Sequence, residues 1–190
     1  FSPDIYLPSF TFETKLARNT DLEWVSSAVL GNRSSLQFIG FADAKDTIEA
    51  TTRQYKTRQV DIDNFNSYTN TLKIRHNYRL KQLHNTLIGG VTYMNNDLHR
   101  RQLGVGTTGT DYDLTIKGNF GRDIHLKTQN WAFFAENLFR INQKWQVSAG
   151  FRLENGASKM SGVIVYLPSD RIPQTIAHRF PLFGISSQYQ

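Results

Sequence analysis

Residues 129–155 alternate between apolar and polar side chains with a period of two, and this pattern constrains the fold more than any other feature. Every second position from residue 145 is apolar, and the positions between them hold Gln, Ser, Gly, Arg and Glu. The first set is Trp145, Val147, Ala149, Phe151 and Leu153. A period of two places the sets on opposite faces of a β-strand. We therefore predict a hairpin of strands 129–141 and 144–155, joined at Asn142 and Gln143.

The same unit of strand, short turn and strand occurs three times along the chain. Short turns are predicted near residues 19, 82 and 142, and long polar connections follow each pair. The predicted strands are 8–17, 21–30, 68–80, 84–98, 129–141, 144–155 and 179–190, with a minor strand at 36–41. The predicted connections are 31–67, 99–128 and 156–178. Outer-membrane barrels combine short periplasmic turns with long extracellular loops, whereas soluble domains seldom contain such loops.

Two architectures fit an alternating sheet, and strand length favours one of them. In a soluble sandwich the apolar face packs in a core, whereas in a membrane barrel it meets lipid. The predicted membrane strands exceed the usual five or six residues and suit a tilted span of about 9–11 residues. Aromatic residues near the strand ends suit interfacial girdles. These are Trp24, Tyr68, Tyr93, Trp131 and Trp145.

Composition excludes or disfavours several other classes. No apolar run approaches the about 20 residues that a membrane helix needs. The chain has 22 basic and 16 acidic residues, but the basic ones are spread along it, which disfavours a nucleic-acid binder. Cysteine is absent, as suits an oxidising compartment. Since no charged leader precedes Phe1 and the chain ends inside a strand-like run, we expect a segment of a longer protein.

The sequence contains no complete motif for catalysis or metal binding. Gly104–Gly109 matches G-x-G-x-x-G but lacks the preceding strand and following helix that nucleotide binding needs. The five histidines have no metal-ligand spacing, and no Ser-His-Asp elbow is present. We therefore expect no enzyme, no catalytic residue, no metal site and no cofactor.

Three segments resemble TonB-dependent outer-membrane receptors. The hairpin Phe133–Glu154 has an aromatic strand, a short polar turn and a strand ending in Gly-x-Arg-x-Glu. The strand Arg179–Tyr189 and the loop Arg100–Leu114 resemble the branch of ferric dicitrate siderophore receptors. The resemblance extends over most of the chain, most clearly from Tyr68 to the end.

The resemblance implies an all-β, antiparallel transmembrane barrel of 22 strands, plugged by an N-terminal domain. Residues 1–190 would supply about seven strands, roughly a third of the barrel, without the plug or the TonB box. The implied function is import of a ferric chelate, such as ferric citrate or another siderophore, across the outer membrane. Its partners would be the TonB–ExbB–ExbD complex, lipopolysaccharide and outer-membrane lipid. A passive porin or structural barrel, and a soluble carbohydrate-binding β-sandwich, remain alternatives.

Basic residues give the one indication of a substrate, because ferric chelates are often anionic. The predicted loops contain Arg53, Lys56, Arg58, Arg100, Arg101 and Arg171. We predict ligand contacts in the loop after residue 98, namely Arg100, Arg101, Thr107, Thr108 and Asp111. We also predict three basic residues lining the barrel lumen, namely Lys73, Arg75 and Arg79.

Overall fold

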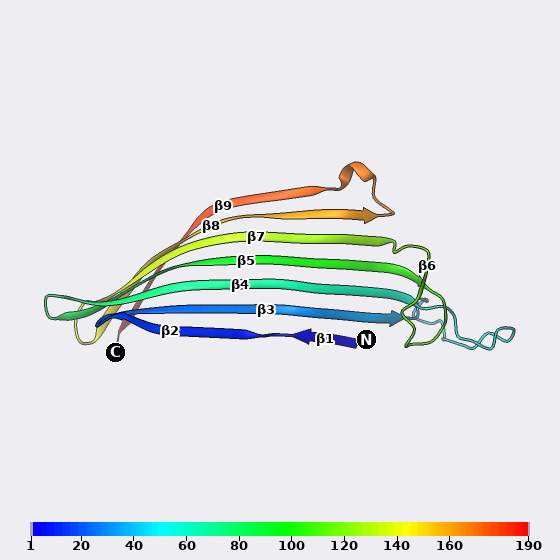
Figure 1. The fold of residues 1–190 in the computed structure, drawn as a ribbon, viewed down its shortest axis with the longest axis horizontal. Helices are drawn as coiled ribbons and strands as arrows, with labels where there is room; N and C mark the ends of the chain where they lie inside the picture. Colours follow the sequence, from blue (N-terminus) through cyan, green and yellow to red (C-terminus); the bar gives the residue numbers. More distant parts are fainter. Residues whose placement is uncertain (1, 190) are drawn as a thin grey trace.

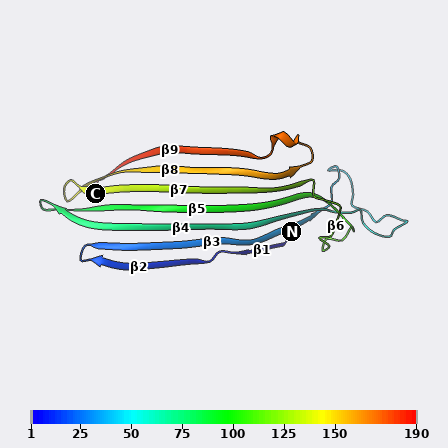
Figure 2. The same cartoon turned by 45° about the horizontal axis from the view of Figure 1, so that its top comes forward.

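The computed structural model describes residues 2–189 and consists of one antiparallel sheet. Its long strands lie side by side in a single curved layer (Figures 1 and 2). The strands are β1 (Ser2–Tyr6), β2 (Ser9–Ala17), β3 (Thr20–Gln37), β4 (Gln59–Leu80), β5 (Leu83–Gly106), β6 (Ile116–Lys117), β7 (Arg122–Arg140), β8 (Trp145–Ile164) and β9 (Gln174–Tyr189). A short 3-10 helix, η1 (Ser169–Arg171), precedes β9.

The strands follow one another in sequence order across the sheet, as in an up-and-down barrel wall. The order is β1-β3-β4-β5-β7-β8-β9, with β2 also on β3 and the small β6 on β5. The seven predicted strands correspond to β2, β3, β4, β5, β7, β8 and β9, which confirms the prediction of about seven strands. The tight turns lie at residues 18–19, 81–82 and 141–144, where the sequence predicts them.

The register brings most of the apolar positions of the strands onto one face. One continuous row of paired residues is Phe12, Trp24, Leu72, Val91, Phe133, Leu153 and Pro181. The next row, on the other face, is Glu13, Glu23, Lys73, Gly90, Phe134, Arg152 and Leu182. No second sheet covers the apolar face within residues 2–189, and Phe133 and Phe151 are about half exposed. The apolar face therefore suits contact with lipid and not the core of a sandwich.

The apolar face has the height of a membrane. On β8 it runs from Trp145 to Leu153, and polar Asn155 follows on the same face. Trp131 lies opposite Asn155 and stacks with Tyr93 at 4.6 Å between ring centroids. The ten steps from Trp145 to Asn155 span about 33 Å along the strand, or about 25 Å along the membrane normal at a tilt near 40°. This height matches the apolar band of outer-membrane barrels.

His76 and Asn137 are polar residues on this face, and both are hydrogen-bonded to neighbouring strands. His76 Nδ1 lies 2.9 Å from the Thr20 hydroxyl. The Tyr78 hydroxyl donates to Asn137 Oδ1 at 3.1 Å. Trp24, predicted as a girdle residue, lies opposite Leu72 inside the band and packs edge-on against Phe10.

The strands are longer than predicted, and this is the main correction to the fold. β4 and β5 have 22 and 24 residues, and both continue well past the aromatic girdle. The true connections are therefore 38–58, 107–121 and 165–173, each much shorter than expected. Above the membrane both faces of the strands meet water. The alternation of apolar and polar side chains therefore ends there, although the backbone pairing continues.

Smaller differences occur at the sheet margins. β1 was not predicted, and it pairs with the upper part of β3. Only Leu36 and Gln37 of the predicted minor strand 36–41 are in a strand, where they extend β3. The last predicted residue of the final strand, Gln190, lies outside the described residues. Among residues 2–189, no helix is long and apolar enough to span a bilayer.

Candidate functional site

Two connections meet at the end of the sheet opposite the short turns and form a cavity of about 650 Å³ that is open to solvent. One connection is 38–58 and the other is 107–121, which includes β6 (Figure 1). The lining residues are Asp46, Arg53, Gln54, Tyr55, Arg58, Thr108, Gly109, Thr110, Asp111 and Tyr112. The volume is in the range of small-molecule sites. The cavity is therefore the candidate ligand site.

Arg58 joins the two connections. Its side chain is only 5% exposed, and it forms ion pairs with Asp46 at 2.7 Å and Asp111 at 2.8 Å. The guanidinium lies 5.5 Å from the Tyr55 ring centroid, and its backbone amide donates to the Thr108 carbonyl at 3.1 Å. The hydrogen bond to Asp46 raises the pKa of Arg58, against the opposing effect of burial. Arg58 is therefore a fixed cation at the base of the cavity.

Arg58 and Asp46 each keep one buried polar atom without a hydrogen-bond partner among the described residues. These atoms are Arg58 Nη1 and Asp46 Oδ1. An unpaired buried donor or acceptor is costly in a folded protein, so such atoms are commonly satisfied by a ligand or water. Both residues line the cavity, and one polar atom of each is buried beside it without a hydrogen-bond partner among the described residues.

A compact turn fixes the second connection. Thr107 and Thr108 each donate a hydroxyl hydrogen bond to Asp113 Oδ2 at 3.0 Å, and the Thr115 amide donates to Asp113 Oδ1 at 3.0 Å. Hydrogen bonds from the side chain and backbone of Thr115, and after them those from Thr107 and Thr108, stabilise the carboxylate and lower the pKa of Asp113 from 3.8 to about 2. The two threonine hydroxyls, predicted as ligand contacts, are thus already used in folding the loop.

Protonation of Asp113 is expected to loosen this turn. Because the folded pKa is depressed, the stabilisation is complete above the unfolded pKa of 3.8 and is lost as the pH falls through about 2. Hydrogen exchange of residues 107–117 should therefore be constant from neutral pH down to about 4 and rise below it, after correction for intrinsic rates. Asp113→Asn should show the faster exchange already at neutral pH. Equal protection in the variant and the wild type would contradict this role.

Arg100 and Arg101 do not line the cavity. Arg100 donates to the carboxylate of Asp63 at 3.0 and 3.3 Å on the polar face, and Arg33 pairs with the same carboxylate. Arg101 points to the opposite face, where it donates to Asn64 Oδ1 at 2.6 Å. Of the five predicted ligand contacts, only Thr108 and Asp111 line the cavity. Contact of any of the five with a ligand stays a prediction.

Asp63 connects β3, β4 and β5 above the membrane. It is 2% exposed and lies between Arg33 and Arg100. Asp63→Asn removes the charge that both arginines share, and we expect a loss of about 2–3 kcal/mol, reduced because both arginines are partly exposed. Faster hydrogen exchange should appear in residues 31–35, 61–65 and 98–102. Unchanged exchange there would show that the cluster has no structural role.

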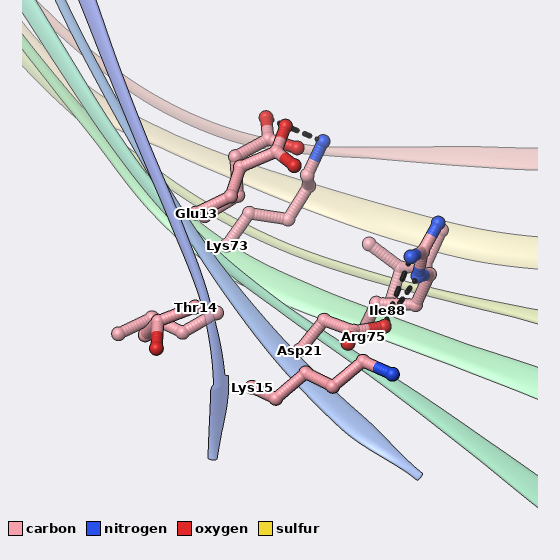
Figure 3. A pocket seen from close by; sticks show the side chains of 9 residues that line it. Glu13, Thr14, Lys15, Asp21, Lys73, Arg75 and Ile88 are labelled. Atoms are coloured by element: carbon pink, nitrogen blue, oxygen red, sulfur yellow. Dashed lines mark hydrogen bonds and ion pairs between the residues drawn. The ribbon is translucent and has the colours of Figure 1, made fainter.

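The polar face near the short turns contains a ladder of opposite charges. Lys73 Nζ lies 2.8 Å from Glu23 Oε1, and Arg75 Nη2 lies 2.9 Å from Asp21 Oδ2. Figure 3 shows these pairs beside Glu13 and Lys15, around a hollow of about 460 Å³. Cross-strand pairs of opposite charge stabilise a sheet, so this wall is polar but largely neutralised.

The three predicted lumen residues share this polar face. Lys73 and Arg75 belong to the ladder, and Arg79 near the turn donates to His84 Nε2 at 2.9 Å.

His99 and His125 stack at 4.0 Å between ring centroids, and each also contacts an aspartate. Among residues 2–189, no group of three or more His, Asp or Glu side chains could hold a metal ion.

A sheet with one lipid-facing surface, one charged surface and long connections at a single end is the wall of an outer-membrane β-barrel. The family model described as "TonB dependent receptor-like, beta-barrel" matches residues 5–167. The chain therefore belongs to the family of TonB-dependent receptor-like β-barrels, which are outer-membrane receptors and not enzymes.

Solved structures show the same fold. The closed form of the ferric-catecholate import receptor Fiu from Escherichia coli K12 aligns with a TM-score of 0.60 and 13% identity, over 97% of this chain and 30% of that chain. The open form aligns with a TM-score of 0.55 and 15% identity, over 95% and 31%. The chain thus spans about a third of these receptors. No curated protein matches it.

Arg58 in the cavity and Asp63 on the polar face were not predicted as functional residues from the sequence. Arg58 was one of several basic loop residues, and its burial depends on Asp46 and Asp111, which lie 12 and 53 positions away. Asp63 was assigned to a solvated loop because β4 was predicted to begin at Tyr68. A prediction that the strands continue past the girdle would have placed Asp63 between two arginines.

Proposed function

We propose that this chain forms part of the wall and the extracellular ligand site of a receptor that imports an anionic ferric chelate. The observation that carries the proposal is the cavity of about 650 Å³ between the two connections, which Arg58, Tyr55 and Tyr112 line. The membership of the family and the fold shared with a ferric-catecholate import receptor support it.

The chemistry of the cavity favours an aromatic chelate over a small aliphatic one. Arg53 and Arg58 supply positive charge, and Asp46 and Asp111 balance it, so charge attraction alone is weak here. Tyr55 and Tyr112 add aromatic surface, and Tyr112 is 94% exposed. Catecholate rings can stack on such surfaces and accept hydrogen bonds, whereas citrate offers only its oxygens. We therefore favour a ferric catecholate over the ferric citrate of the dicitrate branch.

Import is driven in this proposal by TonB–ExbB–ExbD through a plug outside residues 1–190. The connections 38–58 and 107–121 hold the ligand above the plug, and the charged ladder of β3 and β4 faces the plug below. No bond of the ligand is broken in this process, so the residues bind and position the chelate without catalysis.

Binding to the full-length receptor tests the proposal. We expect saturable binding of a ferric tris-catecholate, with weaker binding of ferric citrate. Tyr55→Leu should weaken catecholate binding by about fivefold and leave citrate binding almost unchanged, because a stacked aromatic pair contributes about 1 kcal/mol beyond its buried area. Absence of saturable binding to either chelate would contradict the proposal.

The alternative of a passive porin makes a different prediction. A porin would conduct ions and small solutes without TonB, and uptake would rise linearly with concentration. We expect instead that uptake in iron-limited cells saturates and disappears when TonB is deleted. Linear uptake in cells without TonB would favour the porin.

A further inference from the structure

The three short turns lie together at one end of the sheet, and this end carries an excess of positive charge (Figures 1 and 2). The turns with their flanking residues are 16–20, 79–84 and 140–146, and none of these segments contains Asp or Glu. Each connection at the opposite end contains acidic and basic residues together. We call the five cations of the turn segments the cationic rim; they are Arg18, Arg79, Lys81, Arg140 and Lys144.

The cationic rim is not neutralised by the rest of the sheet. Its five side chains are exposed, and within residues 2–189 none of them forms an ion pair with a carboxylate. Arg79 donates instead to His84 Nε2 at 2.9 Å. Asp21, three residues from Arg18, already pairs with Arg75. The rim is therefore free to attract an anion from outside the chain.

Two hollows separate the three turns, and cations line both of them. A hollow of about 460 Å³ lies between the first and second turns and is lined by Arg18 and Arg79. A hollow of about 370 Å³ lies between the second and third turns and is lined by Arg140 and Lys144. His84 lines both hollows, and no carboxylate lines either of them. Both are open to solvent, so each can admit an acidic group between cations of neighbouring strands.

Lys81 occupies a backbone conformation that favours glycine. Its φ is 56°, and it is the first residue of the two-residue turn between β4 and β5. Glycine or asparagine adopts this conformation with less strain than lysine. The turn would thus form more readily without Lys81, whose contribution is an ammonium group at the tip of the hairpin. Backbone strain of this kind is found preferentially at functional positions.

The faces of the strands direct the rim away from lipid. Leu80 pairs with Leu83 on the apolar face, so this face stays apolar down to the turn. Arg79 and Arg140 lie on the polar face, opposite His84 and Gln146. In outer-membrane barrels the short turns face the periplasm. The rim therefore favours an anion of the aqueous periplasm over the phosphate of a lipid.

The spacing of the turns favours an extended polyanion over a small anion or a folded protein. Neighbouring hairpins are two strands apart, so their turns are separated by at least about 10 Å across the sheet. A small anion cannot reach all three turns. A stable protein interface needs about 800 Å² on each partner and aromatic residues at its centre, which short turns do not provide. Separate point charges on long, flexible side chains suit a polymer with repeated carboxylates.

We propose that the cationic rim is a docking surface for the carboxylates of peptidoglycan, the anionic polymer that lies in the periplasm beneath the outer membrane. Its peptide side chains bear repeated carboxylates. One carboxylate enters each hollow, between Arg18 and Arg79 or between Arg140 and Lys144. Lys81 contacts the polymer at the tip of the middle hairpin. The contact holds the receptor against the cell wall and is independent of the imported ligand.

The test is sedimentation of the purified full-length receptor with purified peptidoglycan sacculi. The rim variant R18Q/K81Q/K144Q removes one cation from each turn. The matched control K127Q/K159Q/R179Q removes three exposed cations from β7, β8 and β9 near the other end of the strands. We expect wild type and control to bind alike and the rim variant to bind about tenfold more weakly, since an exposed ion pair contributes roughly twofold and three are lost. Equal binding of the three proteins would overturn the proposal.

Two further arms test whether charge is responsible. Sacculi whose carboxylates have been converted to neutral amides should bind none of the proteins. The variant R18K/K144R keeps both charges and should bind untreated sacculi as the wild type does. Binding to amidated sacculi as strong as to untreated ones, or binding of R18K/K144R as weak as that of the rim variant, would contradict docking through carboxylates.

Photo-cross-linking in cells distinguishes peptidoglycan from the other anions of the envelope. A photo-reactive amino acid is placed in the full-length receptor at position 81 or, as a control, at position 159. After irradiation the sacculi are isolated and boiled in detergent. We expect the receptor labelled at 81 to remain on the sacculi and the receptor labelled at 159 to be released. Cross-links from position 81 to phospholipid or to another protein, with none to sacculi, would overturn the proposal.

Discussion

Replacing Ala149 by arginine is expected to impair membrane assembly more than any other single change considered for this chain. Ala149 lies on the apolar face of β8, four residues from Trp145 and six from Asn155, near the middle of the band. A charged residue facing lipid at that depth costs about 2–4 kcal/mol. We expect a smaller fraction of the receptor to fold when it is inserted into lipid vesicles. The free energy of unfolding, measured with urea, should fall by the same about 2–4 kcal/mol.

The adjacent residue provides a matched control. Ser148 points to the polar face of the same strand and bonds the Ser186 hydroxyl at 2.9 Å. Ser148→Arg places the same charge one residue away in a polar environment, so its effect should stay below about 1 kcal/mol. If both variants lost the same stability, or if Ser148→Arg lost more, the assignment of the two faces would be wrong.

Replacing Arg58 by glutamine is expected to have the largest effect on ligand binding. The change removes the buried charge between Asp46 and Asp111 and separates the two connections around the cavity. Loss of hydrogen bonds to a charged group costs about 1.5–3 kcal/mol, which corresponds to a roughly 10- to 150-fold weaker affinity. Titration of the full-length receptor with a ferric tris-catecholate measures this affinity.

Lys56→Gln serves as the control, because it removes a nearby loop cation that does not line the cavity. Its affinity should stay within about twofold of wild type. Arg58→Lys should restore part of the affinity, since it keeps the charge but not the planar guanidinium that bonds two aspartates. Equal affinities of wild type and Arg58→Gln would show that the ligand binds elsewhere.

Sequence alternation predicted the membrane part of the fold but not the strands above it. From Trp145 to Leu153 on β8, one face is apolar and the other holds Gln, Ser, Gly and Arg, so the period of two is visible. From His99 to Gly106 on β5 both faces are polar or mixed. The sequence therefore predicts a loop there, although the segment pairs with β4 and β7. Hydrophobic patterning reports the solvent on each face, while pairing depends on backbone hydrogen bonds.

The same limit explains why Arg100 and Arg101 were predicted as ligand contacts although neither lines the cavity. Arg100 and Arg101 were assigned together as loop residues, but adjacent residues of a strand must point to opposite faces. Arg100 therefore meets Asp63 on the inner face, while Arg101 meets Asn64 on the outer face. Thr108 and Asp111 lie beyond the end of β5, where a true connection begins, and they line the cavity. The Arg58–Asp111 contact joins distant positions and has no local sequence signal.

Spin labels placed singly along β8 of the full-length receptor in vesicles test the central claim, that one face of this sheet contacts lipid. Labels on the apolar face should collide with dissolved oxygen more often than with a water-soluble nickel chelate; these are the labels at residues 147, 149, 151 and 153. Labels on the polar face should not show this preference; these are at residues 146, 148, 150 and 152. Beyond Asn155, labels at 157, 159 and 161 should become accessible to the nickel chelate. Equal nickel accessibility on both faces between residues 146 and 153 would contradict a transmembrane barrel.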